Sequence, residues 1–179
     1  MINFEELNYR IFEKTNMARL KHSLNRVEYS KELSLISSLH STQMKKYSFF
    51  SHDNPYNPLL KDLKDRVLYF KLPFSKVTEN IADVPFLDSN DESVFEVRKV
   101  NQENLFYSIK TGKQFFYYNT DSFSEFLVSA WMNSKGHRKN ILDKEVTHLG
   151  CGAVLYFKEI NDIGDTLPQL KVTQNFGRR

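Results

Sequence analysis

The feature that most constrains this 179-residue sequence is an amphipathic helix that runs directly into a glycine and a histidine. Apolar side chains recur at helical spacing between Phe123 and Trp131, and Gly136 and His137 follow shortly after. Glycine tolerates the left-handed conformation that ends many helices. We therefore expect the helix to stop at Gly136 and His137 to point beyond its end. Trp131 lies on the apolar face and is expected in the hydrophobic core.

Two further segments place an ionisable side chain in a turn-like context. One is the run 51–55, which carries His52, and the other is the run 78–80, which carries Glu79. We expect His52, Glu79 and His137 to meet in one cleft, with the imidazole nitrogens of the two histidines roughly 3 to 5 Å apart. Ionisable side chains gathered in this way are typical of a functional site and not of a core.

These segments also carry a family resemblance. Together with the Leu-Gly-Cys-Gly-Ala-Val run at 149–154 and the Gln-Asn-Phe-Gly run at 174–177, they resemble the CAP superfamily of cysteine-rich secretory proteins, antigen 5 and pathogenesis-related proteins. The bacterial branch, with spirochaete outer surface proteins such as those of Borrelia, is the closer match, because it shares the run from the tryptophan to Gly-His-Arg-Lys-Asn-Ile-Leu. The resemblance covers residues 9–177. It is poorest over 83–120, where we predict an insertion that forms a β-hairpin.

The resemblance implies an α+β fold, a three-layer α/β/α sandwich with a central antiparallel sheet. It also implies a secreted or surface-exposed protein with a cleft lined by two histidines and two glutamates. His52, Glu79 and His137 match three of these positions, and the thirteen positions from His137 to Gly150 match the family spacing. The fourth position, a glutamate in the animal proteins, is Ser134 in this chain.

Two neutral imidazoles and one carboxylate are a ligand set that suits Zn²⁺, with positions left open for water. We therefore predict weak to moderate zinc binding by His52, His137 and Glu79. The alternative is that both histidines hydrogen-bond to Glu79 and tie the loops to the sheet without a metal.

Catalysis would need further groups. Beside a metal-bound water, Glu79 is the candidate general base of a hydrolase. However, the sequence contains no GxSxG or HExxH motif and no reactive Cys/His signature that would supply the remaining machinery. Ser134 is more typical of a helix cap than of a nucleophile.

Charge and composition exclude several classes of partner. The 25 basic and 22 acidic residues leave a net charge of +3, and the basic residues form only short clusters, so nucleic acid is not expected. No window resembles a signal peptide or reaches transmembrane length, which taken alone predicts a soluble cytoplasmic protein. The family resemblance implies an exported protein instead, with membrane attachment expected only through a lipid anchor absent from this chain. Cys151 is the only cysteine, which excludes an internal disulfide and predicts a buried strand thiol.

Hydrophobic periodicity predicts one α+β domain over residues 1–179, expected to be a monomer. Helices are predicted over 4–20, over 31–47 with Ser30 as the N-cap, over 59–69, and from Asp121 or Ser122 to Asn133. Strands are predicted over 94–109, 114–118, 150–157 and 170–176, with a hairpin turn at 110–113. His40 lies near an apolar helix face and is predicted to be a hydrogen-bonded core residue and not a ligand.

These observations favour a secreted or surface-exposed binding module. Its expected ligand is a host or envelope protein, glycan or lipid. One alternative is a metal-assisted hydrolase that uses His52, Glu79 and His137. Another is a sterol or fatty-acid carrier, which would require an apolar groove between helices.

Overall fold

The computed structural model describes residues 2–89, 94–101, 103–162 and 164–179. The helices are α1 (Phe4–Lys21), α2 (Lys31–Lys46), the short 3₁₀ helix η1 (Pro58–Leu60), α3 (Leu63–Tyr69), α4 (Thr120–Asn133) and α5 (Lys135–Ile141). The strands are β1 (Glu28–Tyr29), β2 (Lys76–Pro85), β3 (Leu87–Asp88), β4 (Phe95–Val100), β5 (Glu103–Ser108), β6 (Gln114–Tyr117), β7 (His148–Glu159) and β8 (Thr166–Arg178).

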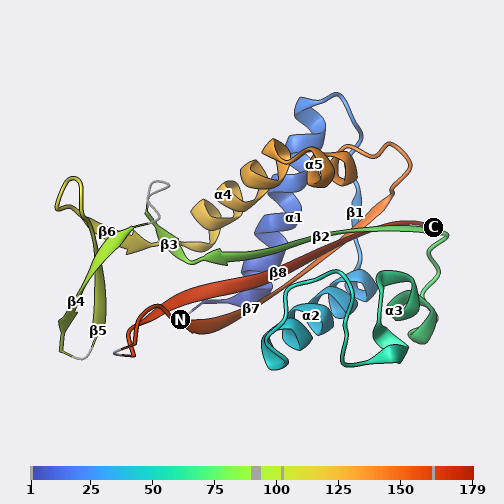
Figure 1. Cartoon of the computed structure of the whole chain (residues 1–179). Helices are drawn as coiled ribbons and strands as arrows, with labels where there is room; N and C mark the ends of the chain where they lie inside the picture. Colours follow the sequence, from blue (N-terminus) through green and yellow to red (C-terminus); the bar gives the residue numbers. More distant parts are fainter. Residues whose placement is uncertain (1, 90–93, 102, 163) are drawn as a thin grey trace.

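The main sheet has the strand order β1-β7-β8-β2. Its three long strands are antiparallel, with Glu79 of β2 opposite Asn175 of β8 and Gly150 of β7 opposite the same Asn175. The short β1 is the exception, because it pairs with β7 in parallel. Helices α1, α4 and α5 lie on one side of the long strands and α2 and α3 lie on the other (Figure 1). The predicted three-layer α+β sandwich is therefore confirmed.

The largest hydrophobic core lies between the main sheet and the helices α1 and α4. Trp131 is 2% exposed within it, which confirms the prediction that this residue is buried. Cys151 also lies in this core, and burial raises the pKa of its thiol to about 12. A smaller core on the opposite face packs Leu33 and Ile36 of α2 against Val67 of α3.

Two glycines of β7 allow α2 to lie directly on the sheet. A Cβ at Gly150 would overlap the backbone nitrogen of Ser34, and a Cβ at Gly152 would overlap that of Ser38. The helix presents small polar side chains to this contact, and the hydroxyl of Ser41 donates to the carbonyl oxygen of Gly152 at 2.9 Å. The Gly-Cys-Gly run is thus explained by backbone-to-backbone packing, which a larger residue would prevent.

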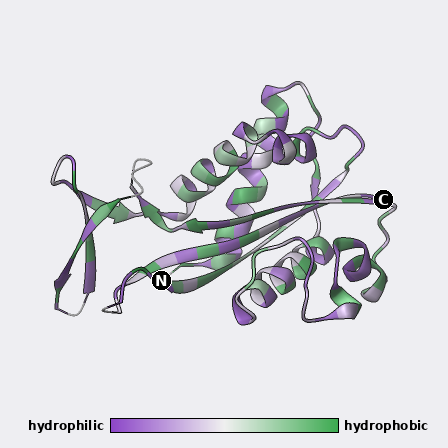
Figure 2. Cartoon of the chain, viewed as in Figure 1, coloured by the Kyte–Doolittle hydropathy of each residue, from purple (hydrophilic) through white to green (hydrophobic). Residues whose placement is uncertain are grey.

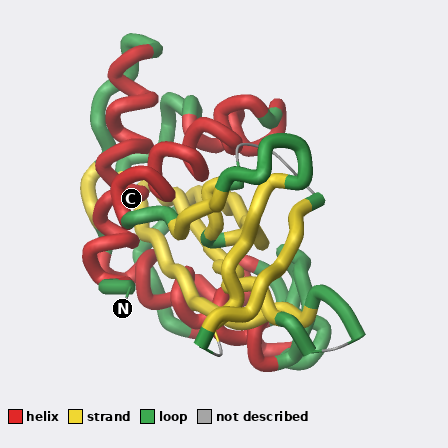
Figure 3. The backbone as a smooth tube through the Cα atoms, turned by 90° about the vertical axis from the view of Figure 1, so that its left-hand side faces the viewer, coloured by secondary structure: helices red, strands yellow, loops and turns green. Residues whose placement is uncertain are grey.

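A second, smaller sheet has the strand order β3-β6-β5-β4 and extends from one end of the molecule (Figure 1). We call β4, β5 and β6 the arm, and Figure 3 turns it toward the viewer. Gly112 has a φ of +67° in the turn between β5 and β6. Hydrophobic and hydrophilic positions alternate along the arm (Figure 2). A small core joins Phe106 and Phe115 of the arm to Leu87 of β3 and Leu167 of β8. Residues 90–93 and 102 of the predicted insertion lie outside the described residues.

The structure corrects two local predictions. The N-cap of α4 is Asn119, and not Asp121 or Ser122, because the Asn119 side chain accepts from the backbone of Ser122 at 2.8 Å. Gly136 does not terminate a helix in the left-handed conformation. Instead, α4 ends at Ser134, whose extended backbone (φ −91°, ψ 123°) breaks the helix, and Gly136 and His137 lie in the following α5.

Replacing Gly152 with alanine is expected to lower the free energy of unfolding by about 1 to 3 kcal/mol or more, because the new methyl group overlaps the backbone of α2. Urea denaturation of the variant and the parent measures this change.

Gly136→Ala is the matched control. A Cβ at Gly136 meets no atom within 4 Å, and the residue has helical backbone. Alanine there is expected to leave stability unchanged or to raise it by up to about 1 kcal/mol through helix propensity. A loss of stability at Gly136 as large as that at Gly152 would contradict the placement of Gly136 in α5.

Candidate functional site

The three residues predicted from the sequence come from three elements around β2. His52 follows α2 in a loop, Glu79 lies within β2, and His137 lies in α5. Nδ1 of His52 and Oε1 of Glu79 are 2.9 Å apart, so the structure brings these two side chains into direct contact. Among the described residues, no hydrogen bond is found for the ring of His137. Its pKa is lowered mainly by burial and further by the nearby charge of His52.

Arg66 is the central residue of this site, although no pattern in the sequence predicts it. Its side chain is 1% exposed, and its Nη2 donates to Oε2 of Glu79 at 2.6 Å. Its Nη1 donates to Nδ1 of His40 at 3.1 Å and to the carbonyl oxygen of His52 at 3.3 Å. The only sequence signal is a charged residue directly before Val67 on the buried face of a short helix, a pattern more typical of a solvated side chain.

His40 is a buried histidine that supports Arg66. It is 1% exposed, and burial lowers its pKa to about 4, so the ring is neutral near pH 7. Its Nε2 lies 2.9 Å from the carbonyl oxygen of Ser51 and must be the protonated nitrogen, which leaves Nδ1 to accept from Arg66. The prediction that His40 is a hydrogen-bonded core residue is confirmed.

Glu79 is a buried carboxylate with both oxygens already engaged. Its side chain is 4% exposed, Oε1 is bonded to His52 and Oε2 to Arg66. The bond to Glu79 is the main cause of a raised pKa at His52. In this arrangement Glu79 is an internal counter-ion, and taking up a proton would weaken its bonds to Arg66 and His52.

The same contacts decide how well a metal fits. Within the described part of the chain, no group of three or more His, Cys, Asp or Glu side chains is arranged to hold a metal ion. The carboxylate that would complete the predicted set already faces the guanidinium of Arg66. The three residues therefore do not fit a three-ligand zinc site as they stand, and zinc binding stays a prediction from the sequence.

Side chains in the run from Trp131 to Asn140 form hydrogen bonds with carbonyl groups on the outer edge of β2. The amide of Asn140 donates to the carbonyl oxygen of Glu79 at 3.0 Å and to the side chain of Asn80 at 2.8 Å. The indole of Trp131 lies 3.4 Å from the carbonyl oxygen of Ile81. Because β2 is an edge strand, these side chains occupy carbonyl groups that would otherwise be free to pair with another strand.

Asn80 connects this edge to the rest of the sheet. Its side chain is fully buried and donates to Gln174 of β8 at 3.1 Å and to the carbonyl oxygen of His137 at 3.3 Å. The two neighbouring residues Glu79 and Asn80 therefore stabilise different parts of the structure. Glu79 faces the Arg66 cluster, and Asn80 fixes the position of the helix that carries His137.

A sequence profile described as CAP, the cysteine-rich secretory protein family, matches residues 12–161. The chain belongs to the CAP family. Its fold agrees with solved CAP-type structures. An extracellular protein of Bacillus anthracis with an SCP domain is 26% identical, with a TM-score of 0.63, and the match covers 98% of this chain and 41% of that one. An outer surface protein of Borrelia burgdorferi is 14% identical, with a TM-score of 0.55, over 94% of this chain and 89% of that one.

Two proteins of Bacillus subtilis are also similar to this CAP chain. The uncharacterized membrane protein YlbC is 28% identical over 143 residues, and the uncharacterized protein YkwD is 28% identical over 146 residues. The matches cover 80% and 81% of this chain but only 30% and 41% of the relatives. The chain thus spans less than half the length of these relatives.

The buried neutral state of His40 predicts a loss of stability in acid. The unfolded chain binds a proton at this histidine near pH 6.5, whereas the folded chain does so only near pH 4. Between these values the unfolded state holds more protons, so stability is complete above pH 6.5 and falls as the pH drops toward 4, by about 3 kcal/mol in total.

Urea denaturation at several pH values between 4 and 7 measures this slope. The His40→Gln variant keeps a hydrogen-bonding side chain but has no titrating group, so much of the slope should disappear, whatever its stability at pH 7. An identical pH dependence in parent and variant would mean that His40 is not the residue responsible.

Proposed function

We propose that this chain is the binding module of a secreted or surface-exposed bacterial protein. The relatives that support this location are the Bacillus anthracis protein described as extracellular and the Borrelia burgdorferi protein described as an outer surface protein. None of the helices in the described residues is both long and apolar enough to cross a bilayer. YlbC is named a membrane protein, and the match covers only 30% of it. We therefore propose that any membrane attachment comes from a segment outside the matched region, such as a lipid anchor.

The observation that carries the proposal is a groove where the arm meets the start of α1. The groove has a volume of about 620 Å³. It is lined by Ile2, Asn3, Phe4, Glu6, Phe86, Tyr117, Tyr118, Asn119, Thr120, Leu155, Phe157 and Pro168. Apolar and aromatic walls with a few polar groups, in a volume of roughly 300 to 1,000 Å³, are typical of ligand sites. Phe157 and Tyr117 are 63% and 53% exposed, so their rings are available to a ligand.

The groove supports an envelope or host molecule with an apolar surface as the ligand. The aromatic rings would contact that surface. The side-chain oxygens of Asn3 and Asn119 already cap α1 and α4, so these two lining residues would offer a ligand only their NH₂ groups. Neither nucleic acid nor a second copy of the chain is needed for such a site.

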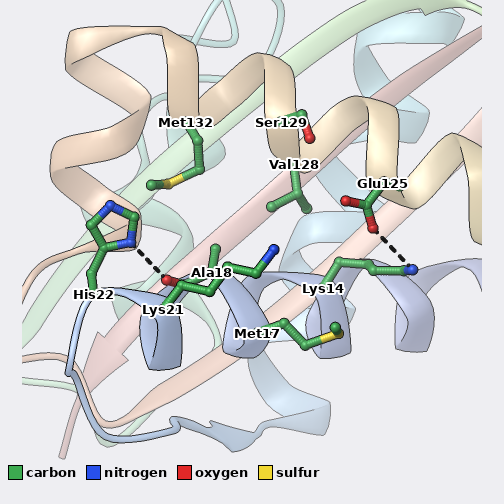
Figure 4. Close-up of a pocket in the computed structure, with 9 residues that line it drawn as sticks. All are labelled: Lys14, Met17, Ala18, Lys21, His22, Glu125, Val128, Ser129 and Met132. Carbon is green, nitrogen blue, oxygen red and sulfur yellow. Dashed lines mark hydrogen bonds and ion pairs between the residues drawn. The ribbon is translucent and has the colours of Figure 1, made fainter.

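The two alternative functions receive less support. The hydrolase hypothesis needs Glu79 as a base, but both oxygens of Glu79 are engaged by His52 and Arg66. The carrier hypothesis needs an apolar groove between helices, and the cavity between α1 and α4 is small, at about 190 Å³ (Figure 4). Lys14 and Glu125, which line this cavity, form an ion pair 3.0 Å long. This volume is below the roughly 300 Å³ of typical ligand sites.

Co-sedimentation with purified peptidoglycan and, separately, with anionic phospholipid vesicles tests the proposal. The parent is expected to bind at least one of them. The double variant Tyr117→Ser with Phe157→Ser is expected to bind it about tenfold more weakly, because it loses the two exposed rings of the groove.

Leu68→Ser with Tyr69→Ser is the control. These residues are 72% and 55% exposed on α3, at the opposite end of the molecule from the arm (Figure 1). The control variant should bind like the parent. Equal losses in both double variants, or no binding of the parent to either material, would contradict the proposal.

A further inference from the structure

The ion pair between Arg66 and Glu79 lies where the sequence predicts a metal ion. Its two atoms are 2.6 Å apart, and both side chains are almost completely buried, at 1% and 4% exposed. Glu79 is the only carboxylate among the three predicted ligands. The charge on this carboxylate is therefore already balanced from within the protein.

Arg66 is fixed in this position by several independent contacts. Its Nη1 donates to the ring of His40 and to the carbonyl oxygen of His52, and a reciprocal capping box between Asp62 and Asp65 defines the start of its helix. A guanidinium group stays charged at all physiological pH values. Arg66 is thus a permanent, preorganised cation beside Glu79.

A divalent ion at Glu79 would have to displace this cation or lie next to it. Displacement would leave a buried guanidinium without its counter-ion, which is strongly unfavourable. Lying next to it would place two like charges in a site with little water. We propose that the guanidinium of Arg66 occupies the cation position of the cleft and excludes a divalent metal from Glu79.

Of the three predicted zinc ligands, only His52 and His137 then remain. Nδ1 of His52 is bonded to Glu79, so its Nε2 is the nitrogen that is left, on a side chain that is 56% exposed. Two imidazoles without a carboxylate leave most coordination positions to water and hold zinc weakly. Any zinc bound by the parent should therefore contact His52 and His137 directly, with Glu79 acting only through its hydrogen bond to His52.

Calorimetric titration of Zn²⁺ into the parent and three variants tests this. Glu79→Gln is expected to weaken zinc binding by the parent only through His52, because Glu79 hydrogen-bonds to that ring without contacting the metal, and a loss of about tenfold is the ordinary size of such an indirect effect. Arg66→Met, which removes the charge but keeps the length, should raise the affinity about tenfold or more, because Glu79 becomes available. Adding Glu79→Gln to Arg66→Met should abolish that gain.

Arg19→Met is the matched control. Arg19 is also buried, at 2% exposed, but its guanidinium donates to the backbone of Ile141 and Asp143, away from Glu79. This variant should not gain zinc affinity. A folded Arg66→Met variant without any gain in zinc affinity would overturn the proposal, and so would a gain that survives when Glu79→Gln is added to Arg66→Met.

A measurement on the parent covers the case in which Arg66→Met does not fold. NMR spectra of the arginine side chains should show the Arg66 guanidinium still held in its ion pair, with its Nη protons protected from exchange with solvent, as zinc is added to concentrations that perturb His52 or His137. Loss of this protection in step with the zinc titration would show that the ion pair with Glu79 is broken, and would overturn the proposal.

Discussion

The contact between α2 and β7 is the constraint on which the rest of this structure depends. Gly150 and Gly152 let the helix backbone lie directly on the strand, and a Cβ at either position would overlap it. Because the two elements are so close, the buried face of α2 has a fixed height above the sheet. His40 lies on that face, so its ring is held at a fixed distance from Glu79 of β2, 4.0 Å between the nearest atoms.

From this contact a chain of hydrogen bonds reaches the surface. His40 is neutral because it is buried, and its free nitrogen accepts from Arg66. Arg66 in turn holds Glu79, and Glu79 holds His52, whose ring is more than half exposed. Each member fixes the protonation or orientation of the next, as expected for buried polar networks. The Nε of Arg66 is the buried atom of this guanidinium for which no partner is found among the described residues. The positions of His40, Arg66, Glu79 and His52 are therefore fixed mainly by one another.

The sequence predicted those helices and buried residues that depend only on neighbouring positions in the chain. The periodicity of α1, the serine cap of α2 and the burial of Trp131 all follow from nearest neighbours along the chain, and the structure confirms them. The predicted stop at Gly136 was wrong, because Ser134 breaks the helix first. A glycine in a sequence does not by itself show whether its backbone adopts a left-handed or an ordinary helical conformation.

The role of Arg66 could not be predicted, because its partners lie 13 and 26 positions away in the sequence. An arginine on a short helix has no local signal that distinguishes a buried ion pair from a solvated side chain. The same holds for Asn140, whose partner Asn80 is 60 positions away. The motif identified Glu79 as an important residue, but only the fold reveals which cation it faces.

Two different kinds of surface lie at the two ends of the molecule. The polar cluster at β2 is neutralised by its own ion pair, whereas the groove at the base of the arm exposes aromatic rings. The proposed binding role rests on the groove, and the residues of the polar cluster are explained by the contacts that join α2, α3 and α5 to β2.

A crystal structure determined in the presence of millimolar zinc tests the central claim most directly. The account predicts that Arg66 and Glu79 remain paired, and that any zinc contacts only the imidazoles of His52 and His137. Zinc bound to the carboxylate of Glu79, with the guanidinium of Arg66 displaced, would contradict it.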